Sequence, residues 1–287
     1  MFRLLRPKQW IKNLLLFAAL VFARKLFDPQ AAITATLAFV AFSLASSSVY
    51  VLNDLIDAER DRLHPEKRHR PIASGQVSSS AAIALCVALT LAALGMGFRI
   101  GFEFGVSIVI YLSMSHFYST LGKHIVILDT MLVAIGFVLR AIAGALAIDV
   151  PFSDWFVLCT LFVALFIALS KRKAELQAGG ANSGARPVLA QYTANSLTAF
   201  TGTSMAAAVI SYSLYVQDVL AENGGQFRRL LLFTVPIVIV AIFRYFLLVD
   251  SGRAGEKPEE TLLKDRTLQL SILGFMFIAI SAFYGGA

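Results

Sequence analysis

The chain has 287 residues, of which 57% are hydrophobic and 15% are charged, and its mean hydropathy is +0.72. This composition excludes an ordinary soluble domain, in which about half of the residues are apolar and about a quarter are charged. The formal net charge of +7 fits a protein that meets anionic lipid head groups or phosphorylated substrates, although cytoplasmic anchoring of a membrane protein produces much of such a charge by itself.

Apolar segments long enough to cross a bilayer follow one another along the chain. A helix needs about 17–25 apolar residues to cross the hydrocarbon core. We predict an all-α integral membrane protein in which residues 1–287 form a single domain, and we expect no cleavable signal peptide because the first apolar segment has no small-residue cleavage site. The nine predicted spans are 11–27, 31–52, 79–98, 103–121, 126–148, 154–170, 195–217, 229–249 and 267–284.

Lys and Arg residues gather on one side of this predicted topology. Of the 25 Lys and Arg residues, most lie in the N-terminal arm or in the stretches 58–78, 171–194 and 250–266, all on the side of the N-terminus. Cytoplasmic loops are enriched in Lys and Arg, so we expect a multi-pass inner-membrane protein whose N-terminus and functional site face the cytoplasm. The stretch 179–187 has the Gly, Asn and Ser content of a mobile loop, and whether it forms a lid stays open.

The second predicted span ends in an acidic sequence, VYVLNDLIDAERD, residues 49–61. If the helix continues through this sequence, Asp54, Asp57 and Asp61 lie at positions i, i+3 and i+7 and share one face. Three carboxylates on one face repel each other unless a hard cation lies between them, and Mg²⁺ prefers carboxylate and phosphate oxygens. We therefore predict that these three acids are catalytic and bind magnesium, with Asn53 assisting in substrate binding.

Basic residues follow the acids within one short loop. Lys67, Arg68 and Arg70 are close enough in sequence to act together, and cations beside a metal-bound diphosphate neutralise the charge of the leaving group. We predict that Lys67 and Arg70 bind a diphosphate. The alternative is an ordinary charged helix end, in which the acids pair with neighbouring Arg and Lys side chains.

These residues resemble the first signature of the UbiA superfamily of intramembrane prenyltransferases. The resemblance rests on Asn53-Asp54-x-x-Asp57-x-x-x-Asp61, followed by Arg70-Pro71-Ile72-Ala73-Ser74-Gly75. It implies a fold of nine transmembrane helices around a central cavity, with a polar cap on the cytoplasmic side, and a magnesium-dependent reaction of a diphosphate substrate.

The second signature of the superfamily differs in this chain. Aromatic prenyltransferases usually carry another Asp-rich motif after the sixth helix, whereas this sequence has SKRKAEL at residues 170–176. Cations at this position favour direct contact with a phosphate without a metal. We predict that Lys171 and Arg172 bind a phosphate substrate, and an anchor at the cytoplasmic face is the alternative. Arg172 and Glu175 lie at positions i and i+3, so we also predict that they pair and that one orients the other.

Three further segments resemble the decaprenyl-phosphate phosphoribosyltransferase branch of the superfamily. They are RPKQWIKN at 6–13, LRAIAG at 139–144 and KDRTLQL at 264–270. The resemblance implies transfer of 5-phosphoribosyl from phosphoribosyl diphosphate to a polyprenyl (decaprenyl-type) phosphate with release of diphosphate, and it implies that Lys12 binds substrate. In actinobacteria the product of this branch is used in cell wall biosynthesis, and the sequence leaves open which pathway this protein serves. Oligomers occur in this branch, which leaves a homo-oligomer open, and we expect no nucleic-acid partner.

Three polar residues in or near the fourth and fifth spans complete the candidate site. Tyr118 and Lys123 lie at the cytoplasmic end of the fourth span, where the family has a substrate-contacting loop, so we predict that both bind substrate, although Tyr118 also suits a membrane interface. Arg140 lies about 16 Å deeper in the fifth span than Asp129. Intramembrane charges face a cavity or a partner, so Arg140 either binds a substrate phosphate or holds helices together.

Two other function classes remain as alternatives. A UbiA-type prenyltransferase with a prenyl diphosphate donor and an aromatic acceptor would keep the first acidic motif, but the basic segment at 170–176 argues against it. A membrane transporter would carry ionisable or helix-breaking residues near the middle of several spans, whereas only Arg140 lies clearly deep in this sequence.

Overall fold

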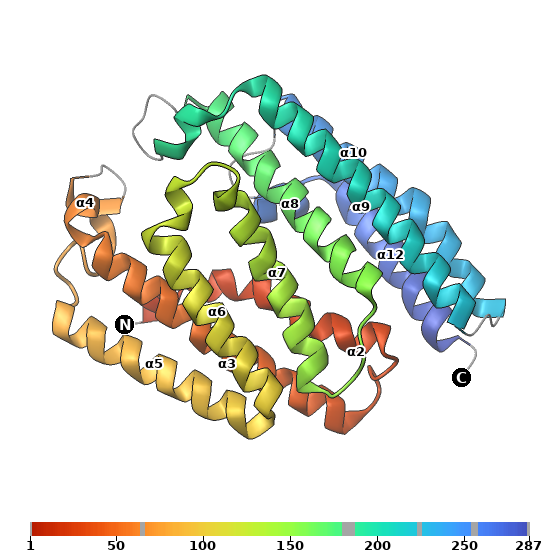
Figure 1. Ribbon diagram of the computed structural model, residues 1–287, viewed down its shortest axis with the longest axis horizontal. Coiled ribbons are helices and arrows are strands. Elements are labelled where there is room, and N and C mark those ends of the chain that lie inside the picture. The colour runs from red at the N-terminus through yellow and green to blue at the C-terminus, as the bar shows by residue number, and fades with distance from the viewer. Residues whose placement is uncertain (1, 64–66, 180–186, 223–225, 254–257, 286–287) are drawn as a thin grey trace. The chain divides into compact units, whose positions relative to one another are not determined.

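The computed structural model of the protein describes residues 2–63, 67–179, 187–222, 226–253 and 258–285. Within these ranges the chain forms α-helices and 3₁₀ helices (η) and no strand (Figure 1). The chain divides into two compact units. Unit 1 comprises Met1–Thr120 and Leu139–Pro151, and unit 2 comprises Leu121–Val138 and Phe152–Ala287.

Most helices belong to a single unit, whereas α7 (Leu128–Ala147) contributes residues to both. Unit 1 contains α1 (Phe2–Leu5), η1 (Pro7–Phe17), α2 (Ala18–Phe22), α3 (Pro29–Ile56), α4 (Ala58–Arg62), η2 (Lys67–His69), α5 (Ser79–Ile100) and α6 (Phe102–Thr120). Unit 2 contains η3 (Gly122–His124), α8 (Asp154–Gln177), η4 (Pro187–Gln191), α9 (Ala194–Glu222), η5 (Gln226–Phe233), α10 (Thr234–Asp250), α11 (Pro258–Lys264) and α12 (Arg266–Tyr284).

Seven helical segments of the described residues are long and apolar enough to cross a membrane. They are Pro29–Ile56, Ser79–Ile100, Leu128–Ala147, Asp154–Gln177, Ala194–Ala221, Arg229–Asp250 and Arg266–Tyr284. These segments confirm an all-α, multi-pass membrane protein.

The count of nine spans is not confirmed. The predicted first span, 11–27, forms the 3₁₀ helix η1 and the short α2 in place of one long α-helix. The predicted span 103–121 is the helix α6, but Glu103, His116 and several serines make its composition less apolar than that of the seven segments.

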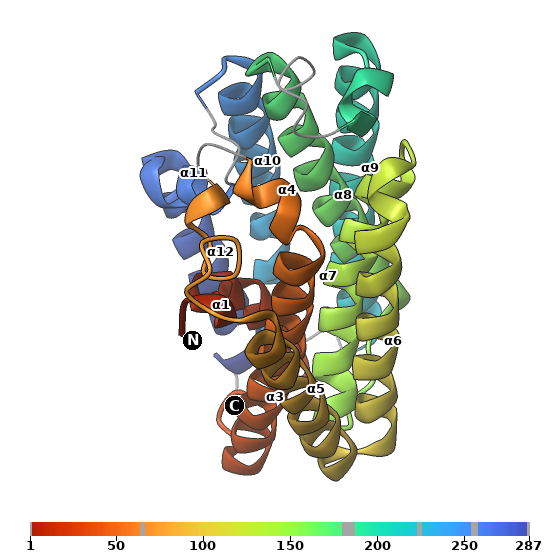
Figure 2. The same cartoon turned by 90° about the vertical axis from the view of Figure 1, so that its left-hand side faces the viewer.

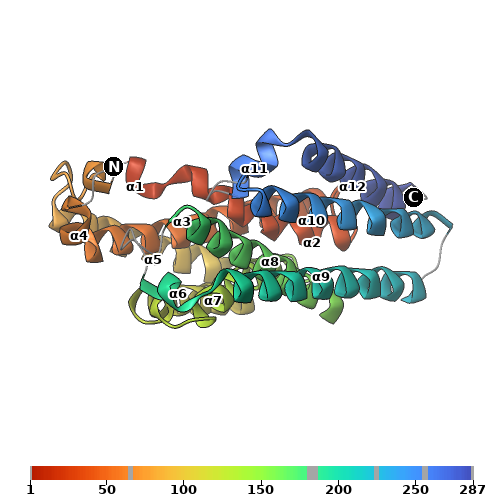
Figure 3. The ribbon, with the colours of Figure 1, turned by 90° about the horizontal axis from the view of Figure 1, so that it is seen from above.

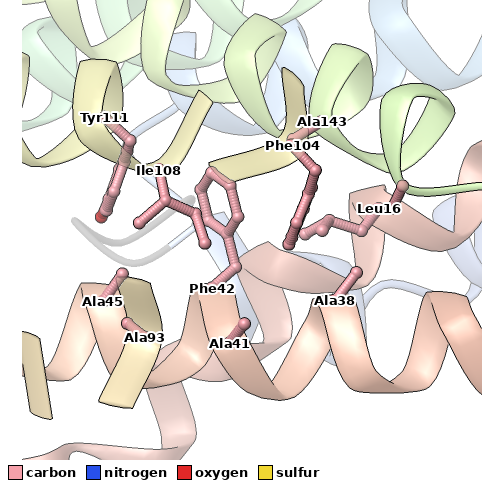
Figure 4. Close-up of a cluster of buried hydrophobic side chains, with 11 residues drawn as sticks. Leu16, Ala38, Ala41, Phe42, Ala45, Ala93, Phe104, Ile108, Tyr111 and Ala143 are labelled. Carbon is pink, nitrogen blue, oxygen red and sulfur yellow. The ribbon is translucent and has the colours of Figure 1, made fainter. Parts of the chain in front are cut away.

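Phe42 lies at the centre of the hydrophobic core of unit 1. Its side chain extends from α3 toward Phe104 and Ile108 of α6 (Figure 4), and its ring centroid is 5.0 Å from that of Tyr111. Buried alanines on α3 surround it, including Ala38. Small residues let neighbouring helices approach closely, which is how helices pack where lipid removes the hydrophobic driving force.

Hydrogen bonds join one side of the 3₁₀ helix η1 to α3. Trp10 Nε1 donates to Ser47 Oγ at 3.0 Å, and Asn13 Nδ2 donates to Ser43 Oγ at 3.0 Å. Residues three apart share one row of a 3₁₀ helix, and such helices rarely exceed 3–4 residues. These bonds along one row account for an η1 of 11 residues.

Unit 2 is built around packed helices, with α10 and α12 side by side (Figure 3). The rings of Phe166 and Tyr245 meet edge to face at 5.7 Å in its core. Asp265 caps α12 by accepting from the backbone N–H of Leu268 at 3.0 Å. The Arg244 guanidinium beside Asp265, with Nη2 at 2.7 Å, holds the pKa of that carboxyl below its usual value. The segment 264–270 therefore joins two helices of this unit.

Gly144 provides a test of how closely η1 packs in unit 1. A Cβ at this position would overlap the carbonyl oxygen of Leu16, so we expect Gly144→Ala to destabilise the fold by about 1–3 kcal/mol through overpacking. A lowered thermal midpoint in detergent would show this effect. Gly95→Ala on α5 is the matched control, because nothing lies within 4 Å of its Cβ position. Equal midpoints for the two variants would contradict the close contact.

Candidate functional site

The acidic sequence lies where α3 gives way to α4. The helix α3 continues to Ile56, one turn beyond the predicted end, and therefore carries Asn53 and Asp54. Asp57 has φ −89° and ψ 2°, which lie outside the helical range, so α3 ends at Ile56. The next helix, α4, begins at Ala58 (Figure 2). The expectation that one helix carries all three acids is therefore wrong, since Asp61 lies on α4.

Asp54 and Asp61 converge on the same nitrogen of Arg70. Arg70 Nη1 lies 2.7 Å from Asp61 Oδ2 and 3.1 Å from Asp54 Oδ1. The two acids are 3% and 4% exposed, so their charges need partners within the protein. The structure thus joins two predicted metal ligands to one predicted diphosphate ligand.

Arg6 is a fourth member of this cluster that sequence reasoning missed. Its Nη2 donates to Asp54 Oδ1, and its guanidinium lies 5.2 Å from the ring centroid of Tyr50. Arg6 has φ 49°, a backbone conformation that is uncommon for residues other than Gly. The segment RPKQWIKN contained the residue, but a cation before a proline gave no indication of an ion pair with an acid 48 positions away.

The donor set fits a magnesium ion that also binds substrate. Mg²⁺ in proteins is commonly held by one or two carboxylates, with water and substrate phosphates as the other ligands. Asp54 and Asp61 supply two such carboxylates, which lie close enough together for both to contact Nη1 of Arg70. No group of three His, Cys, Asp or Glu side chains among the described residues could hold a metal, so the structure does not bring Asp57 into one cluster with the other two acids.

Four other predicted substrate-binding residues of unit 1 lie on four different elements. Asn53 precedes Asp54 on α3, Lys67 begins η2 and accepts the Arg70 N–H with its carbonyl at 2.9 Å, and Lys12 and Tyr118 lie on η1 and α6. All four predicted substrate-binding residues are half-buried.

Arg140 joins three elements within unit 1. It lies on α7, and its Nε donates to Asn13 Oδ1 of η1 at 2.8 Å. Its Nη2 donates to the hydroxyl of Tyr111 on α6 at 3.1 Å, and its guanidinium lies 5.9 Å from the ring centroid of Phe42 on α3. Of the two readings left open by the sequence, these contacts favour a residue that holds helices together.

The three cations of the basic segment of α8 differ in burial and in their partners. Arg172 is buried, and its Nε and Nη1 donate to Asp129 Oδ2 and Glu175 Oε2, each at 2.7 Å. Lys173 pairs with Asp250 at 2.6 Å. Lys171 is 40% exposed, with Nζ 3.9 Å from Glu175 Oε1. The predicted pairing of Arg172 with Glu175 is confirmed, and Lys171 is the cation of this segment that is most accessible to a substrate.

Tyr192 extends this ionic cluster to Ile127, at the end of the loop that carries the predicted substrate residue Lys123. The Tyr192 hydroxyl donates to Asp129 Oδ1 and accepts the backbone N–H of Ile127, each at 2.7 Å. Burial, together with the hydrogen bond to Asp129, raises the pKa of Tyr192 to about 12. Lys123 is half-buried in η3, four positions before Ile127. Sequence reasoning missed Tyr192, which follows the stretch 179–187, and residues 180–186 of that stretch lie outside the described residues.

The different environments of Arg172 and Lys171 make a stability test. Arg172→Gln leaves two buried carboxylates without their guanidinium, so we expect it to lower the free energy of unfolding by about 3–5 kcal/mol. Lys171→Gln removes a partly exposed charge and should cost no more than about 1 kcal/mol. Denaturant titration in mixed micelles measures both losses. Equal losses would show that Arg172 does not depend on its buried partners.

Comparison with known proteins finds relatives of this chain over nearly its full length. The model of the UbiA prenyltransferase family matches residues 14–264. The decaprenyl-phosphate phosphoribosyltransferase of Mycolicibacterium smegmatis is 38% identical over 290 residues, covering 97% of this chain and 91% of that protein. The enzyme of the same name from Corynebacterium glutamicum is 36% identical over 291 residues, covering 99% and 86%.

Solved structures show the same fold. A UbiA homolog from Archaeoglobus fulgidus bound to DMAPP and Mg²⁺ has a TM-score of 0.72 at 20% identity, over 98% of both chains. The same homolog bound to GPP and Mg²⁺ has a TM-score of 0.70 at 20% identity, over 99% of this chain and 97% of that one. The matched family model and the full-length relatives together show that this chain belongs to the UbiA prenyltransferase family.

Proposed function

We propose that this protein transfers the 5-phosphoribosyl group of phosphoribosyl diphosphate to a polyprenyl phosphate of decaprenyl type and releases diphosphate. The observation that carries the proposal is the similarity, over 97% and 99% of this chain, to two enzymes named decaprenyl-phosphate phosphoribosyltransferase. The charged residues of the two units supply both kinds of group that the reaction needs, carboxylates for a metal and cations for phosphates.

The donor diphosphate is assigned to the acidic cluster of unit 1. Asp54 and Asp61 would hold Mg²⁺, and Asp57 at the break between α3 and α4 is the third proposed carboxylate. The ion supplies positive charge to the departing diphosphate when it is bound. Arg70 lies within hydrogen-bonding distance of both buried acids, so it can donate to phosphate oxygens beside them, with Asn53 and Lys67 assisting.

The acceptor phosphate is assigned to cations of unit 2. Lys171 is 40% exposed, and Lys123 in η3 is half-buried, so both ammonium groups can meet an anionic lipid head group. An acceptor phosphate oxygen forms a bond to the anomeric carbon, and the bond from that carbon to the diphosphate oxygen breaks with its electron pair. The acceptor is already anionic, so the reaction needs no general base.

The proposed setting is the inner membrane, with the N-terminus and the charged clusters on the cytoplasmic side. The enrichment of Lys and Arg on that side of the predicted topology supports this orientation. The single domain, the cell wall pathway and the homo-oligomer stay predictions.

The role proposed for Arg172 changes from binding a phosphate to orienting its neighbours, because its Nε and Nη1 are bonded to Asp129 and Glu175.

A label-transfer assay tests the proposal. The purified protein in detergent would receive Mg²⁺, radiolabelled phosphoribosyl diphosphate and decaprenyl phosphate, with EDTA in a parallel reaction. We expect label to enter the lipid phase only without EDTA. If no label enters, and the same preparation consumes a prenyl diphosphate in the presence of an aromatic acceptor, the protein is an ordinary prenyltransferase of its family.

Turnover should depend on the three aspartates of the first motif and not on Glu59, which lies between Asp57 and Asp61. We expect Asp54→Asn, Asp57→Asn and Asp61→Asn each to lower turnover at least about 100-fold, because metal and diphosphate lose a charged ligand. Glu59→Gln is the matched control, since Glu59 is exposed on α4 in the same segment. Size-exclusion profiles in detergent report folding. Unchanged turnover in Asp57→Asn would restrict the metal ligands to Asp54 and Asp61.

A further inference from the structure

The loop between α6 and α7 is held in a strained conformation. Ile127 has φ 70°, and a β-branched residue in the left-handed region is a genuine outlier. Such a residue persists only where its surroundings over-determine it, and these positions gather at functional sites. The strain lies at the end of the loop that carries Lys123, directly before α7 begins at Leu128.

One hydroxyl fixes this strained residue from outside the loop. The backbone N–H of Ile127 donates to the Tyr192 hydroxyl, which in turn donates to Asp129 Oδ1. Tyr192 is 5% exposed, and its ring packs with Leu169, which lies on α8. The hydroxyl therefore uses one acceptor site and its one hydrogen within the protein, and the buried ring gives it little freedom to move.

The same contacts continue to the end of α8. Asp129 is 0% exposed, and its other oxygen, Oδ2, accepts from Arg172 Nε at 2.7 Å. Arg172 directly follows Lys171 on α8. A continuous path of short hydrogen bonds thus runs from Ile127 through Tyr192 and Asp129 to the residue beside Lys171.

Backbone hydrogen bonds connect the turn that contains Lys123 with the residues around Ile127. The N–H of Ile125 donates to the carbonyl of Gly122 at 3.2 Å, and the N–H of Asp129 donates to the carbonyl of Ile125 at 3.0 Å. These bonds link the turn that contains Lys123 to the start of α7, which directly follows Ile127.

We infer that Tyr192 is a positioning residue for the acceptor phosphate, because its hydroxyl sets where the Lys123 turn stands relative to Lys171. This inference rests on the proposed function and goes beyond it. Tyr192 need not touch either substrate. We expect its effect on the acceptor, because Lys123 and Lys171 are the cations assigned to the acceptor phosphate.

Tyr192→Phe tests the inference, because it removes the hydroxyl and keeps the buried ring. We expect the KM for decaprenyl phosphate to rise about tenfold, which corresponds to about 1.4 kcal/mol, while the KM for phosphoribosyl diphosphate stays within about twofold of wild type. Tyr212→Phe is the matched control, because Tyr212 is 7% exposed in the same unit and its hydroxyl bonds Thr234. It should leave both KM values unchanged.

A second substitution separates positioning from a general loss of stability. Gly adopts the left-handed conformation without strain, so Tyr192→Phe combined with Ile127→Gly should recover part of the lost affinity for decaprenyl phosphate. The inference is overturned if Tyr192→Phe leaves the KM for decaprenyl phosphate at the wild-type value, whether or not it lowers the thermal midpoint.

Direct binding keeps this test separate from the proposed function. If the wild-type protein transfers no phosphoribosyl group, the proposed reaction is wrong. Native mass spectrometry with decaprenyl phosphate alone then compares the same variants. Weaker lipid binding by Tyr192→Phe than by Tyr212→Phe would support the positioning role, and equal binding would overturn it.

Discussion

A charge buried among the helices of a membrane protein needs a partner within the protein, and this requirement shapes both units. Asp54 and Asp61 are both bonded to Arg70, and Arg172 is bonded to Asp129 and Glu175. Removal of one member leaves an uncompensated charge in a medium of low dielectric constant, which costs far more than an exposed pair is worth. These contacts therefore fix the ends of α3, α4, α7 and α8 where the chemistry is proposed to occur.

Each cluster contains both acids and cations, which suits a reaction between two phosphorylated substrates. Buried carboxylates in unit 1 can attract a metal and its diphosphate, whereas the cations of α8 need no metal to attract a phosphate monoester. Within α8, Arg172 is buried with its acids, and Lys171 is 40% exposed. Neighbouring residues of one basic segment thus divide into one that maintains structure and one that can meet a substrate.

Local periodicity predicted most of the helices and the pair Arg172–Glu175, because those features depend on residues close in sequence. It did not predict the break at Asp57, where an acid-rich sequence remains compatible with a continuing helix. Nor could it find the bond from Arg172 to Asp129, 43 positions away, since a single acid in an apolar segment carries no sign of its partner. The 3₁₀ form of η1 likewise depends on Ser43, Ser47 and other tertiary contacts that composition does not reveal.

The assignment of the two clusters to two substrates is the central claim. A structure of the protein in lipid nanodiscs with Mg²⁺ and phosphoribosyl diphosphate, without acceptor, tests it most directly. We predict that the metal and the diphosphate lie against Asp54, Asp61 and Arg70. Density for the diphosphate at Lys171 or Lys123, with none beside the two acids, would contradict the assignment.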